Sequence, residues 1–381
     1  MGSELERIEM LRRIFCIDRI DSRIGARAGA DTGTGTGADT GTGTGTDTDT
    51  ETDTDTETGA DTGTDTGTGA GADLILPTTI RNGRIIEGIG DDAAILAPVA
   101  NPLVWTIDSV VEGVHFKREW LSFEDLGFRA TMAAASDLAA MGAEPIALLA
   151  ALVLPDYVSD ENLKMLAEGQ RAAADRVGAP LVGGNLARGG EISITTTALG
   201  SAARPLRRSG AKPGDALFMA GPVGLAAAGV KLLQTGSSLE DARAIPAIFA
   251  WRRPIARIAE GRRAAPIATA AIDVSDGLAR DVGHIARESG VGITLFKSAL
   301  VSPELAGVAS LLGISPIELA LHGGEDYALV IAAPEDAALS PEFVLIGRCE
   351  AGSPGIVLAG EDGSLLPVEE RGFDHFAKPP G

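Results

Sequence analysis

The stretch Gly88-Ile89-Gly90-Asp91-Asp92-Ala93-Ala94-Ile95-Leu96 sets two adjacent carboxylates on a glycine-flanked turn that leads into an apolar strand. Carboxylates at the start of a strand are costly to desolvate without a partner, so they need a hard cation, a basic side chain or contact with solvent water. Asp91 and Asp92 therefore suit a metal site better than a hydrophobic core.

Three acidic residues farther along the chain lie where a solvated charge is unusual. Asp108 follows an apolar strand pattern, Asp137 interrupts an apolar helix pattern, and Asp273 ends another apolar run. Each of them, taken alone, is more typical of a helix cap or a satisfied turn. Taken with Asp91, they favour a site for Mg²⁺, which binds oxygen ligands and keeps positions open for phosphate oxygens.

Asp276 has two interpretations. It precedes Gly277 and a predicted helix, so it is a good N-cap candidate, but it also extends the carboxylate group to five. Phosphoryl transfer is the natural chemistry for several magnesium ions, because its barrier is mostly charge to be neutralised and groups to be aligned. The chain has no P-loop and no kinase glycine-rich loop, so ATP would have to be held through metals and backbone amides.

Strand and helix patterns alternate after the opening stretch, as in an α/β protein. The expected strands of a first unit are 93–96, 103–107, 146–154, 180–182 and 191–199, with helices at about 123–141 and 159–177. A linker rich in Arg, Pro and Gly is expected at 201–215. The expected strands of a second unit are 217–220, 269–273, 292–295, 327–331 and 343–347, with helices at about 223–234, 277–289 and 303–312.

The residues before the opening stretch differ in character. Apolar residues at helical spacing predict a short amphipathic helix at 4–17, whereas 28–72 is almost entirely Thr with Gly, Asp or Glu. This second segment cannot bury enough apolar surface to offset chain entropy, so it is predicted to be a disordered insert. The predicted division is an N-terminal helix within 1–27, the insert 28–72, an N-terminal domain 73–203 and a C-terminal domain 204–381.

Composition narrows the class of protein. The chain has 381 residues, 45% of them hydrophobic, and a net charge of -21, of which -10 comes from the insert. A moderately acidic remainder argues against nucleic acid or an anionic membrane surface as a partner. Cys16 and Cys349 cannot form a disulfide framework, and the N-terminus lacks the apolar core of a signal peptide. A soluble cytoplasmic protein is therefore expected.

Seven sequence blocks, read together, identify a resemblance. They are GIGDDAAIL, TIDSVVEGVHF (106–116), SDLAAMGAEP (136–145), RSGAKPGD (208–215), DVSDG (273–277), GGEDY (323–327) and GFDHF (372–376). In order and spacing they resemble the thiamine-monophosphate kinase family, across nearly the whole chain outside the insert. The resemblance implies an α/β two-domain fold with an aminoimidazole ribonucleotide synthetase-like N-terminal domain, built on a mixed sheet, and an α/β C-terminal domain. It also implies a homodimer formed through the N-terminal domain, with ATP and several Mg²⁺ bound at the cleft.

The same resemblance implies roles for individual residues, each at the position that matches a family motif. The implied magnesium ligands are Asp91, Thr106, Asp108, Asp137, Asp273 and Asp276, with the amide of Asn185 as a further candidate ligand. Gly184, Asn185, Arg208 and Ser275 would contact ATP. His115, Glu325 and Phe373 would contact thiamine monophosphate. A lone His is more often structural, and a C-terminal Phe is about equally often a packing residue, so both alternatives stay open.

The implied reaction is direct in-line transfer of the γ-phosphoryl group of ATP to thiamine monophosphate, giving thiamine diphosphate. No general base is expected, because a phosphate monoester has its second pKa near 6 and is mostly dianionic at about pH 7. The enzyme mainly has to overcome repulsion between two polyanions, which bridging Mg²⁺ does.

Two departures from the family pattern keep alternatives open. Asn185 stands where the family usually has an Asp, so one expected carboxylate is an amide that can ligate a cation without adding charge. Gly224-Leu225-Ala226 replaces the usual Gly-Asp-Ser, which removes polar groups near a helix start. The alternatives to an active kinase are a weakly active or inactive member that binds thiamine phosphates or nucleotide, and a related ATP-dependent synthetase.

Overall fold

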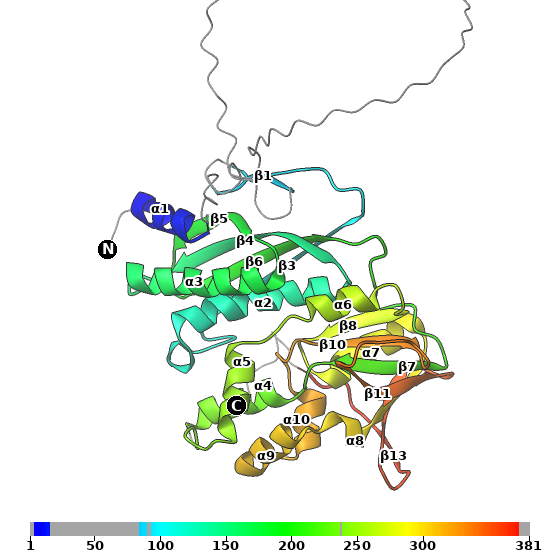
Figure 1. Cartoon of the computed structure of the whole chain (residues 1–381). Coiled ribbons are helices and arrows are strands. Elements are labelled where there is room, and N and C mark those ends of the chain that lie inside the picture. The colour runs from blue at the N-terminus through cyan, green and yellow to red at the C-terminus, as the bar shows by residue number, and fades with distance from the viewer. Residues whose placement is uncertain (1–3, 16–83, 90–92, 237, 373–381) are drawn as a thin grey trace, which may run out of the picture. The chain divides into compact units, whose positions relative to one another are not determined.

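Two mixed β-sheets packed against helices make up the described part of the chain (Figure 1). The computed structural model describes residues 4–15, 84–89, 93–236 and 238–372, which belong to one compact unit. The predicted insert 28–72 and the turn residues 90–92 lie outside the described residues. The α/β class with mixed sheets is confirmed, while the predicted domain boundary at 203/204 stays a prediction.

The first sheet has four strands in the order β3-β6-β4-β5. Their bounds are β3 (Leu103–Val111), β4 (Glu144–Leu154), β5 (Leu181–Arg188) and β6 (Ser193–Ser201). β6 runs antiparallel to β3 and β4, whereas β5 runs parallel to β4. β5 continues well past the predicted end at 182, because Gly183 and Gly184 remain in the strand although glycine pairs usually signal a turn.

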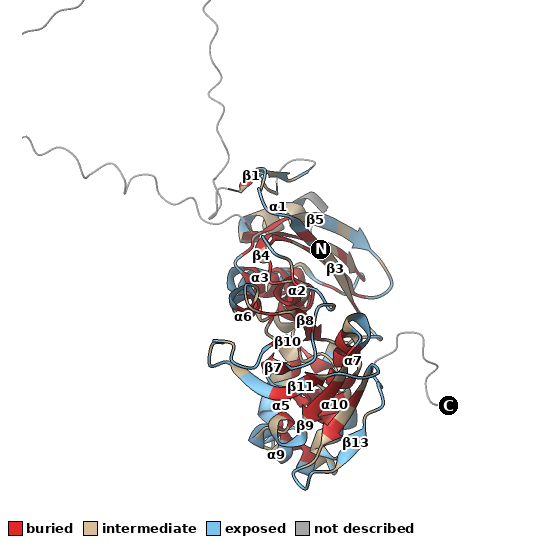
Figure 2. Cartoon of the chain, turned by 90° about the vertical axis from the view of Figure 1, so that its right-hand side faces the viewer, coloured by how far each residue is buried: buried red, intermediate tan, exposed pale blue. Residues whose placement is uncertain are grey.

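Two long helices cover one face of this sheet, α2 (Phe123–Ala140) and α3 (Asp160–Val177). A serine caps the N-terminus of each helix, since Ser122 accepts from the Asp125 amide at 3.0 Å and Ser159 from the Asn162 amide at 3.2 Å. The helices approach closely at Gly169, where an added Cβ would lie 1.9 Å from the Glu124 carbonyl oxygen. α2 is buried along almost its whole length (Figure 2), which fits its alanine-rich sequence.

The second sheet has seven strands in the order β13-β12-β9-β11-β7-β10-β8. Their bounds are β7 (Asp215–Ala220), β8 (Ala270–Val274), β9 (Gly292–Phe296), β10 (Ala328–Pro334), β11 (Phe343–Glu350), β12 (Gly355–Ala359) and β13 (Leu365–Pro367). Only β9 and β12 pair in parallel among these described strands. The helices of this half are α4 (Leu225–Thr235), α5 (Ala244–Arg252), α6 (Ile258–Ala264), α7 (Leu278–Ser289), α8 (Lys297–Leu300), α9 (Pro303–Leu312) and α10 (Pro316–His322).

A small apolar core joins the two halves. It contains Ala140 at the end of α2, Ala264 in α6, Ala271 in β8, and Leu329 and Ile331 in β10. Because α2 packs against β8, the acidic residues of both elements approach one another. The junction therefore positions the candidate site described below.

The N-terminal helix α1 (Glu4–Phe15) packs against α3 although 87 residues separate it in sequence from β3, the first strand of this sheet. Its Arg7 Nε lies 2.8 Å from Asp160 Oδ1, and Phe15 is buried. The predicted helix at 4–17 is thus confirmed over the described residues. Two short strands, β1 (Ile85–Glu87) and β2 (Ile95–Leu96), pair antiparallel, one before and one after Asp91 in the sequence.

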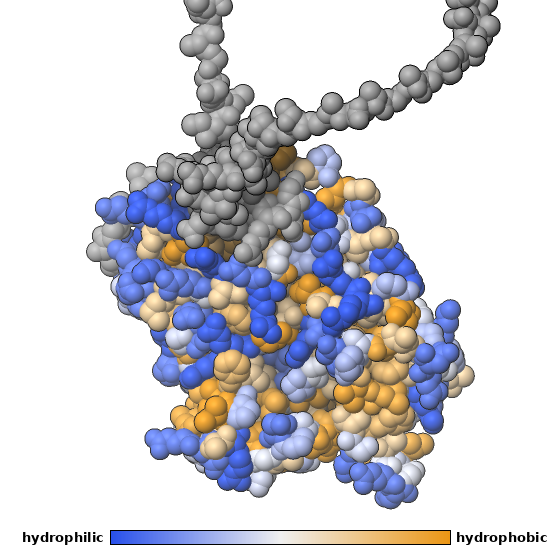
Figure 3. All heavy atoms as spheres, viewed as in Figure 1, coloured by the Kyte–Doolittle hydropathy of each residue, from blue (hydrophilic) through white to orange (hydrophobic). Residues whose placement is uncertain are grey.

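The surface in Figure 3 is mixed, with hydrophilic residues prevailing around α1 and α3 and apolar residues gathering over elements of the second sheet. Among the described helices, no single one is long and apolar enough to cross a membrane. Among these helices, only α9 and α10 taken together have the length and apolar composition of a membrane span, and the two are bent by 108°. Both helices contribute buried residues to the core of the second half.

Candidate active site

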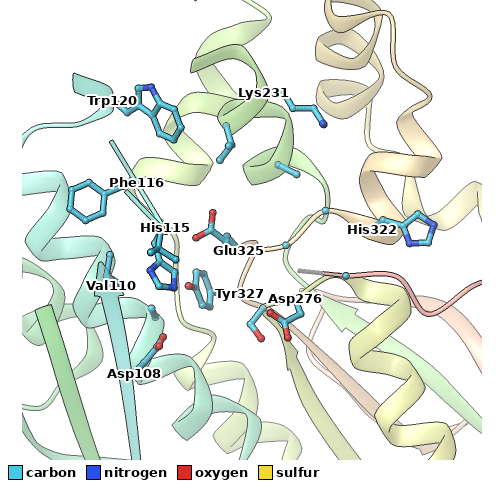
Figure 4. A pocket seen from close by; sticks show the side chains of 18 of the residues that line it. Asp108, Val110, His115, Phe116, Trp120, Lys231, Asp276, His322, Glu325 and Tyr327 are labelled. Carbon is cyan, nitrogen blue, oxygen red and sulfur yellow. The ribbon is translucent and has the colours of Figure 1, made fainter. Parts of the chain in front are cut away.

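A pocket of about 980 Å³ lies where α2, β3 and β8 meet the loop 323–327. One part of its wall is carboxylate-rich and contains Asp108, Asp137, Asp273 and Asp276. Another part contains His115, Trp120 and Glu325, with Lys231 of α4 and His322 of α10 farther along (Figure 4). Four residues predicted to bind metal (Asp108, Asp137, Asp273 and Asp276) and two predicted to bind the acceptor (His115 and Glu325) therefore line one cavity.

The alternation of β3 explains why two predicted ligands face α2. Leu103, Trp105 and Ile107 are exposed, whereas Thr106 and Asp108 are partly buried on the opposite side of the strand. The Thr106 hydroxyl donates a hydrogen bond to Asp137 Oδ2 in α2. Thr106 thereby orients one carboxylate of the pocket.

The carboxylates of this wall are electrostatically unfavourable without a cation. Burial raises the pKa of Asp108 and of Asp137. Burial, and then repulsion from Asp137, raises the pKa of Asp273 to about 7, against a hydrogen bond of 2.7 Å that the Ser136 hydroxyl donates to it. A bound divalent cation would relieve this repulsion.

The donor set fits magnesium in chemistry, because it consists of hard carboxylate and hydroxyl oxygens. Within the described residues, no three His, Cys, Asp or Glu side chains are placed to hold a metal ion together. Mg²⁺ commonly uses only one or two carboxylates and fills its octahedron with water and substrate phosphates. Asp91, the first predicted ligand, lies outside the described residues, as does its neighbour Asp92.

The interpretation of Asp276 as the N-cap of α7 is wrong. Gly277 occupies the cap position with φ +125°, and no cap side chain bonds there. Asp281 takes that role from inside the helix, where its Oδ2 accepts from the amides of Ser275, Asp276 and Gly277 at 3.0–3.1 Å. The Asp276 side chain instead faces the pocket (Figure 4), 3.6 Å from Arg280.

The four predicted ATP contacts are placed in different surroundings. Ser275 lines the pocket, and Arg208 lies close enough that its charge lowers the pKa of Asp137. Gly184 and Asn185 lie in β5 and do not line this pocket. An added Cβ at Gly184 would lie 1.9 Å from the Ala150 carbonyl oxygen, so close strand packing accounts for this glycine. The roles of all four residues stay predictions.

His115 is held in one tautomer by its own turn. Its Nδ1 accepts from the Val111 amide at 3.0 Å, while its amide donates to the Val111 carbonyl at 2.9 Å. An accepting Nδ1 has no hydrogen, so the neutral ring carries its hydrogen on Nε2. The donor atom of the neutral ring is therefore Nε2, and His115 lines the pocket.

The loop 323–327 has an unusual backbone. Glu325 and Tyr327 have φ of 66° and 50°, a left-handed region that costs about 1–2 kcal/mol for residues with a side chain. Between them, Asp326 accepts from the amides of Gly224 and Ala226 at 2.6 and 3.0 Å. Asp326 thus caps α4, supplying the polar group that Gly224-Leu225-Ala226 lacks.

Several functional candidates were not visible in the sequence. Arg129 of α2 and Trp251 of α5 both contact the Glu325 carboxylate, and Trp120 packs edge-on against Trp251. No sequence signal pairs Arg129 with Glu325, which is 196 residues away. Phe373, the third predicted acceptor contact, lies outside the described residues, although Gly372 before it lines the pocket.

Comparisons with known proteins agree with this geometry. A family model described as "AIR synthase related protein, N-terminal domain" matches residues 90–202. The chain is 37% identical to the thiamine-monophosphate kinase of Salmonella typhimurium over 315 residues, covering 79% of this chain and 95% of that protein. It is 34% identical over 291 residues to the enzyme of that name from Aquifex aeolicus, covering 76% of this chain and 92% of that protein.

Solved structures of thiamine-monophosphate kinases are also similar to this chain. The chain matches a structure described as AaThiL complexed with AMPPCP and TMP, with a TM-score of 0.68 and 34% identity over 76% of this chain and 92% of that one. Escherichia coli HypE, a hydrogenase maturation protein, matches with a TM-score of 0.61 at 23% identity, covering 76% of this chain and 92% of that one, which shows a shared fold alone. By its extended identity to these kinases, the chain belongs to the thiamine-monophosphate kinase family.

Proposed function

We propose that this protein transfers the γ-phosphoryl group of ATP to the phosphate of thiamine monophosphate, forming thiamine diphosphate and ADP. The observation that carries this proposal is the meeting of Asp108, Asp137 and Asp273 with His115 and Glu325 in one pocket. Relatives named thiamine-monophosphate kinase, and a related structure with AMPPCP and TMP, support the same substrates.

In this proposal the residues of the pocket have different roles in the reaction. Asp108, Asp137, Asp273 and Asp276 would hold Mg²⁺, with Asp91 as a further ligand, and the ion would neutralise charge between two polyanions. Thr106 and Ser136 orient the Asp137 and Asp273 carboxylates through their hydroxyls. His115 would donate from Nε2 to the acceptor, and Ser275 and Arg208 would contact the phosphates of ATP. No side chain has to remove a proton, because the acceptor phosphate is already dianionic at about pH 7.

The direct test is formation of thiamine diphosphate by the purified protein with ATP, thiamine monophosphate and Mg²⁺. We expect ADP release that depends on thiamine monophosphate and stops when the metal is chelated. ADP release without thiamine monophosphate would point to a related synthetase. Binding of both substrates without turnover would identify an inactive member, for which the amide of Asn185 supplies a physical reason.

We also infer that the chain forms a homodimer through the exposed face of its first sheet. Leu103, Trp105 and Ile107 are 59–72% exposed along β3, on the side that α2 and α3 leave uncovered. A contiguous apolar strip of this kind on a sheet favours burial against another surface. Analytical ultracentrifugation should show a dimer that Trp105→Glu converts to monomer, and a monomeric wild-type protein would contradict the inference.

The cytoplasmic location stays part of the proposal. It rests on the expected reducing compartment for Cys349, which is buried and unpaired by any disulfide within the described residues.

A further inference from the structure

Glu325 is held at the pocket wall by two residues from different helices. Arg129 Nη2 of α2 forms an ion pair with Glu325 Oε1, and Trp251 Nε1 of α5 donates to Oε2 at 2.8 Å. Each carboxylate oxygen therefore has one protein donor. Since a carboxylate offers about four lone-pair directions, capacity remains for a ligand on the pocket side.

Arg129 and Trp251 also fix each other. Arg129 Nη1 donates to the Trp251 carbonyl oxygen, and the guanidinium lies 4.6 Å from the centroid of the Trp251 ring. Both side chains are almost completely buried, with exposed fractions of 1% and 0%. The Trp251 ring in turn meets Trp120, a pocket residue, edge-on at 5.8 Å. Arg129, Trp251 and Glu325 thus form a closed unit, here called the Glu325 clamp.

Stability alone does not account for the Glu325 clamp. An ion pair with a fully buried partner usually gains little over apolar residues of the same size, because Arg129 loses its hydration and Glu325, which is 29% exposed, loses part of its own. The φ of 66° at Glu325 adds backbone strain, which the surrounding contacts must offset. A strained, paired carboxylate at a pocket wall is instead typical of a residue held for ligand recognition.

The Glu325 clamp is connected to the carboxylate wall through α2. Arg129, Ala133 and Asp137 follow one another at a spacing of four residues, so they share one face of the helix. Ala133 and Asp137 line the pocket, and Arg129 lies behind Glu325. One helix, α2, therefore sets the distance between the carboxylate wall and Glu325.

We propose that Arg129 and Trp251 are positioning residues that aim the Glu325 carboxylate at the charged heterocycle of the acceptor substrate. This inference rests on the proposed function. Thiamine carries a permanently positive thiazolium ring and an aminopyrimidine, and a fixed carboxylate in the pocket that Trp120 also lines can recognise both a cation and an N–H donor. The clamp thereby determines specificity for a cationic heteroaromatic phosphate.

The sharpest test is Trp251→Phe, which removes the Nε1 donor and keeps a ring against Trp120 and Arg129. We expect the KM and the calorimetric Kd for thiamine monophosphate to rise about five- to tenfold. The kcat and the KM for ATP should stay within about twofold of the wild type. Arg129→Lys, which keeps the charge but loses the planar fork, should show the same pattern.

Arg253→Met is the matched control. Arg253 also joins the end of α5 to α2, lying 4.4 Å from the Phe128 ring and 3.0 Å from Asp125, but it does not line the pocket. Its loss should lower the Tm without changing the KM for thiamine monophosphate. A purely structural role for the Glu325 clamp predicts the same behaviour for Trp251→Phe, and that result would overturn the proposal.

A ligand comparison separates this proposal from the proposed function. The probe is the thiophene analogue of thiamine monophosphate, in which the charged ring nitrogen is replaced by carbon. We expect the wild type to bind it at least tenfold more weakly than thiamine monophosphate, and Trp251→Phe and Arg129→Lys to narrow that difference. Equal binding of both ligands by the wild type overturns the specificity role alone, whereas absence of any thiamine monophosphate binding overturns the proposed function as well.

Discussion

The carboxylate wall and the Glu325 clamp line the same pocket. Asp137 and Asp273 of the wall differ from Glu325 in whether a cation of the protein forms an ion pair with the carboxylate. Asp137 and Asp273 are held by hydroxyl groups and form no ion pair within the described part of the chain. Glu325 instead has a buried arginine of the protein's own. Repulsion from Asp137 therefore acts on Asp273 without an ion pair to offset it, and a ligand cation would relieve that repulsion, whereas Arg129 already compensates the charge of Glu325.

The largest expected effect comes from the carboxylate wall. Asp108→Asn should lower kcat/KM about a thousandfold or more, because it removes a charge that would hold the metal. The Tm should not fall, since burial already raises the pKa of Asp108 and a neutral side chain avoids that desolvation. Steady-state kinetics and thermal unfolding measure the two quantities, and near-normal activity would remove Asp108 from the metal site.

The opposite outcome is expected at the Glu325 clamp. Arg129→Met should destabilise the fold by about 1–3 kcal/mol, because it leaves the partly buried Glu325 carboxylate without its charged partner. The double variant with Glu325→Gln should recover part of that loss, since the stranded charge is removed as well. Urea unfolding measures both, and a single variant as stable as the wild type would show that the Arg129–Glu325 ion pair does not form in solution.

Mg²⁺ should stabilise the folded protein by binding at the carboxylate wall and not at the Glu325 clamp. At ten times its Kd, Mg²⁺ should raise the free energy of unfolding by about 1.4 kcal/mol, following from mass action on the folded state. Asp273→Asn should reduce this gain, whereas Arg253→Met should leave it unchanged. An equal gain in Asp273→Asn would place the metal elsewhere.

Asp326 extends the comparison to a carboxylate that caps a helix. Loss of hydration raises its pKa to about 7, above the ordinary value near 3.9, despite the amides of Gly224 and Ala226. A folded-state pKa above the unfolded one means that the folded protein binds more protons between pH 4 and 7. The free energy of unfolding should therefore rise as pH falls through this window, by at most about 1.4 kcal/mol per pH unit from this group. Asp326→Asn should remove that contribution in denaturant titrations across pH, and an unaltered slope would contradict it.

The smallest effect is expected at Asn185. Asn185→Asp should lower the Mg²⁺ concentration needed for half-maximal activity a few-fold, because it restores a charge to the predicted metal set. Asn185 lies exposed in β5 and does not line the pocket, so Asn185→Ala is the control for a simple packing effect. An unchanged magnesium requirement in both variants would show that this position is not a ligand.

Elements with strong periodicity were predictable from the sequence. The bounds of α2, α3 and α7 agree with the prediction to within one or two residues, because caps such as Ser122 and Ser159 mark their starts. Short elements were missed, among them α5, α6, α10, the edge strand β13 and its neighbour β12. Helices of seven to nine residues and strands of three to five carry too few turns or alternations for a pattern to emerge.

Some residues of the site were likewise predictable from the sequence, and others were not. Local motifs around Asp108, Asp137 and Asp273 indicated a carboxylate group, because a charge inside an apolar run is unusual wherever it occurs. Asp281 was missed, since an acid in the first turn of a helix is common and its three amide contacts depend on the backbone of 275–277. Arg129 and Trp251 were missed because a basic residue in a helix and a Trp in an apolar run have no unusual local pattern.

The sequence by itself determined the fold class, the family and the acidic residues of the site, since periodicity and local motifs are properties of neighbours along the chain. Only the tertiary structure decided which of these residues share a cavity, which atom of His115 carries the hydrogen, and that Asp281, not Asp276, caps α7. It also decided the pairing of Arg129 with Glu325. Contacts across 196 residues arise from the packing of α2 against the loop 323–327, and no local pattern encodes that packing.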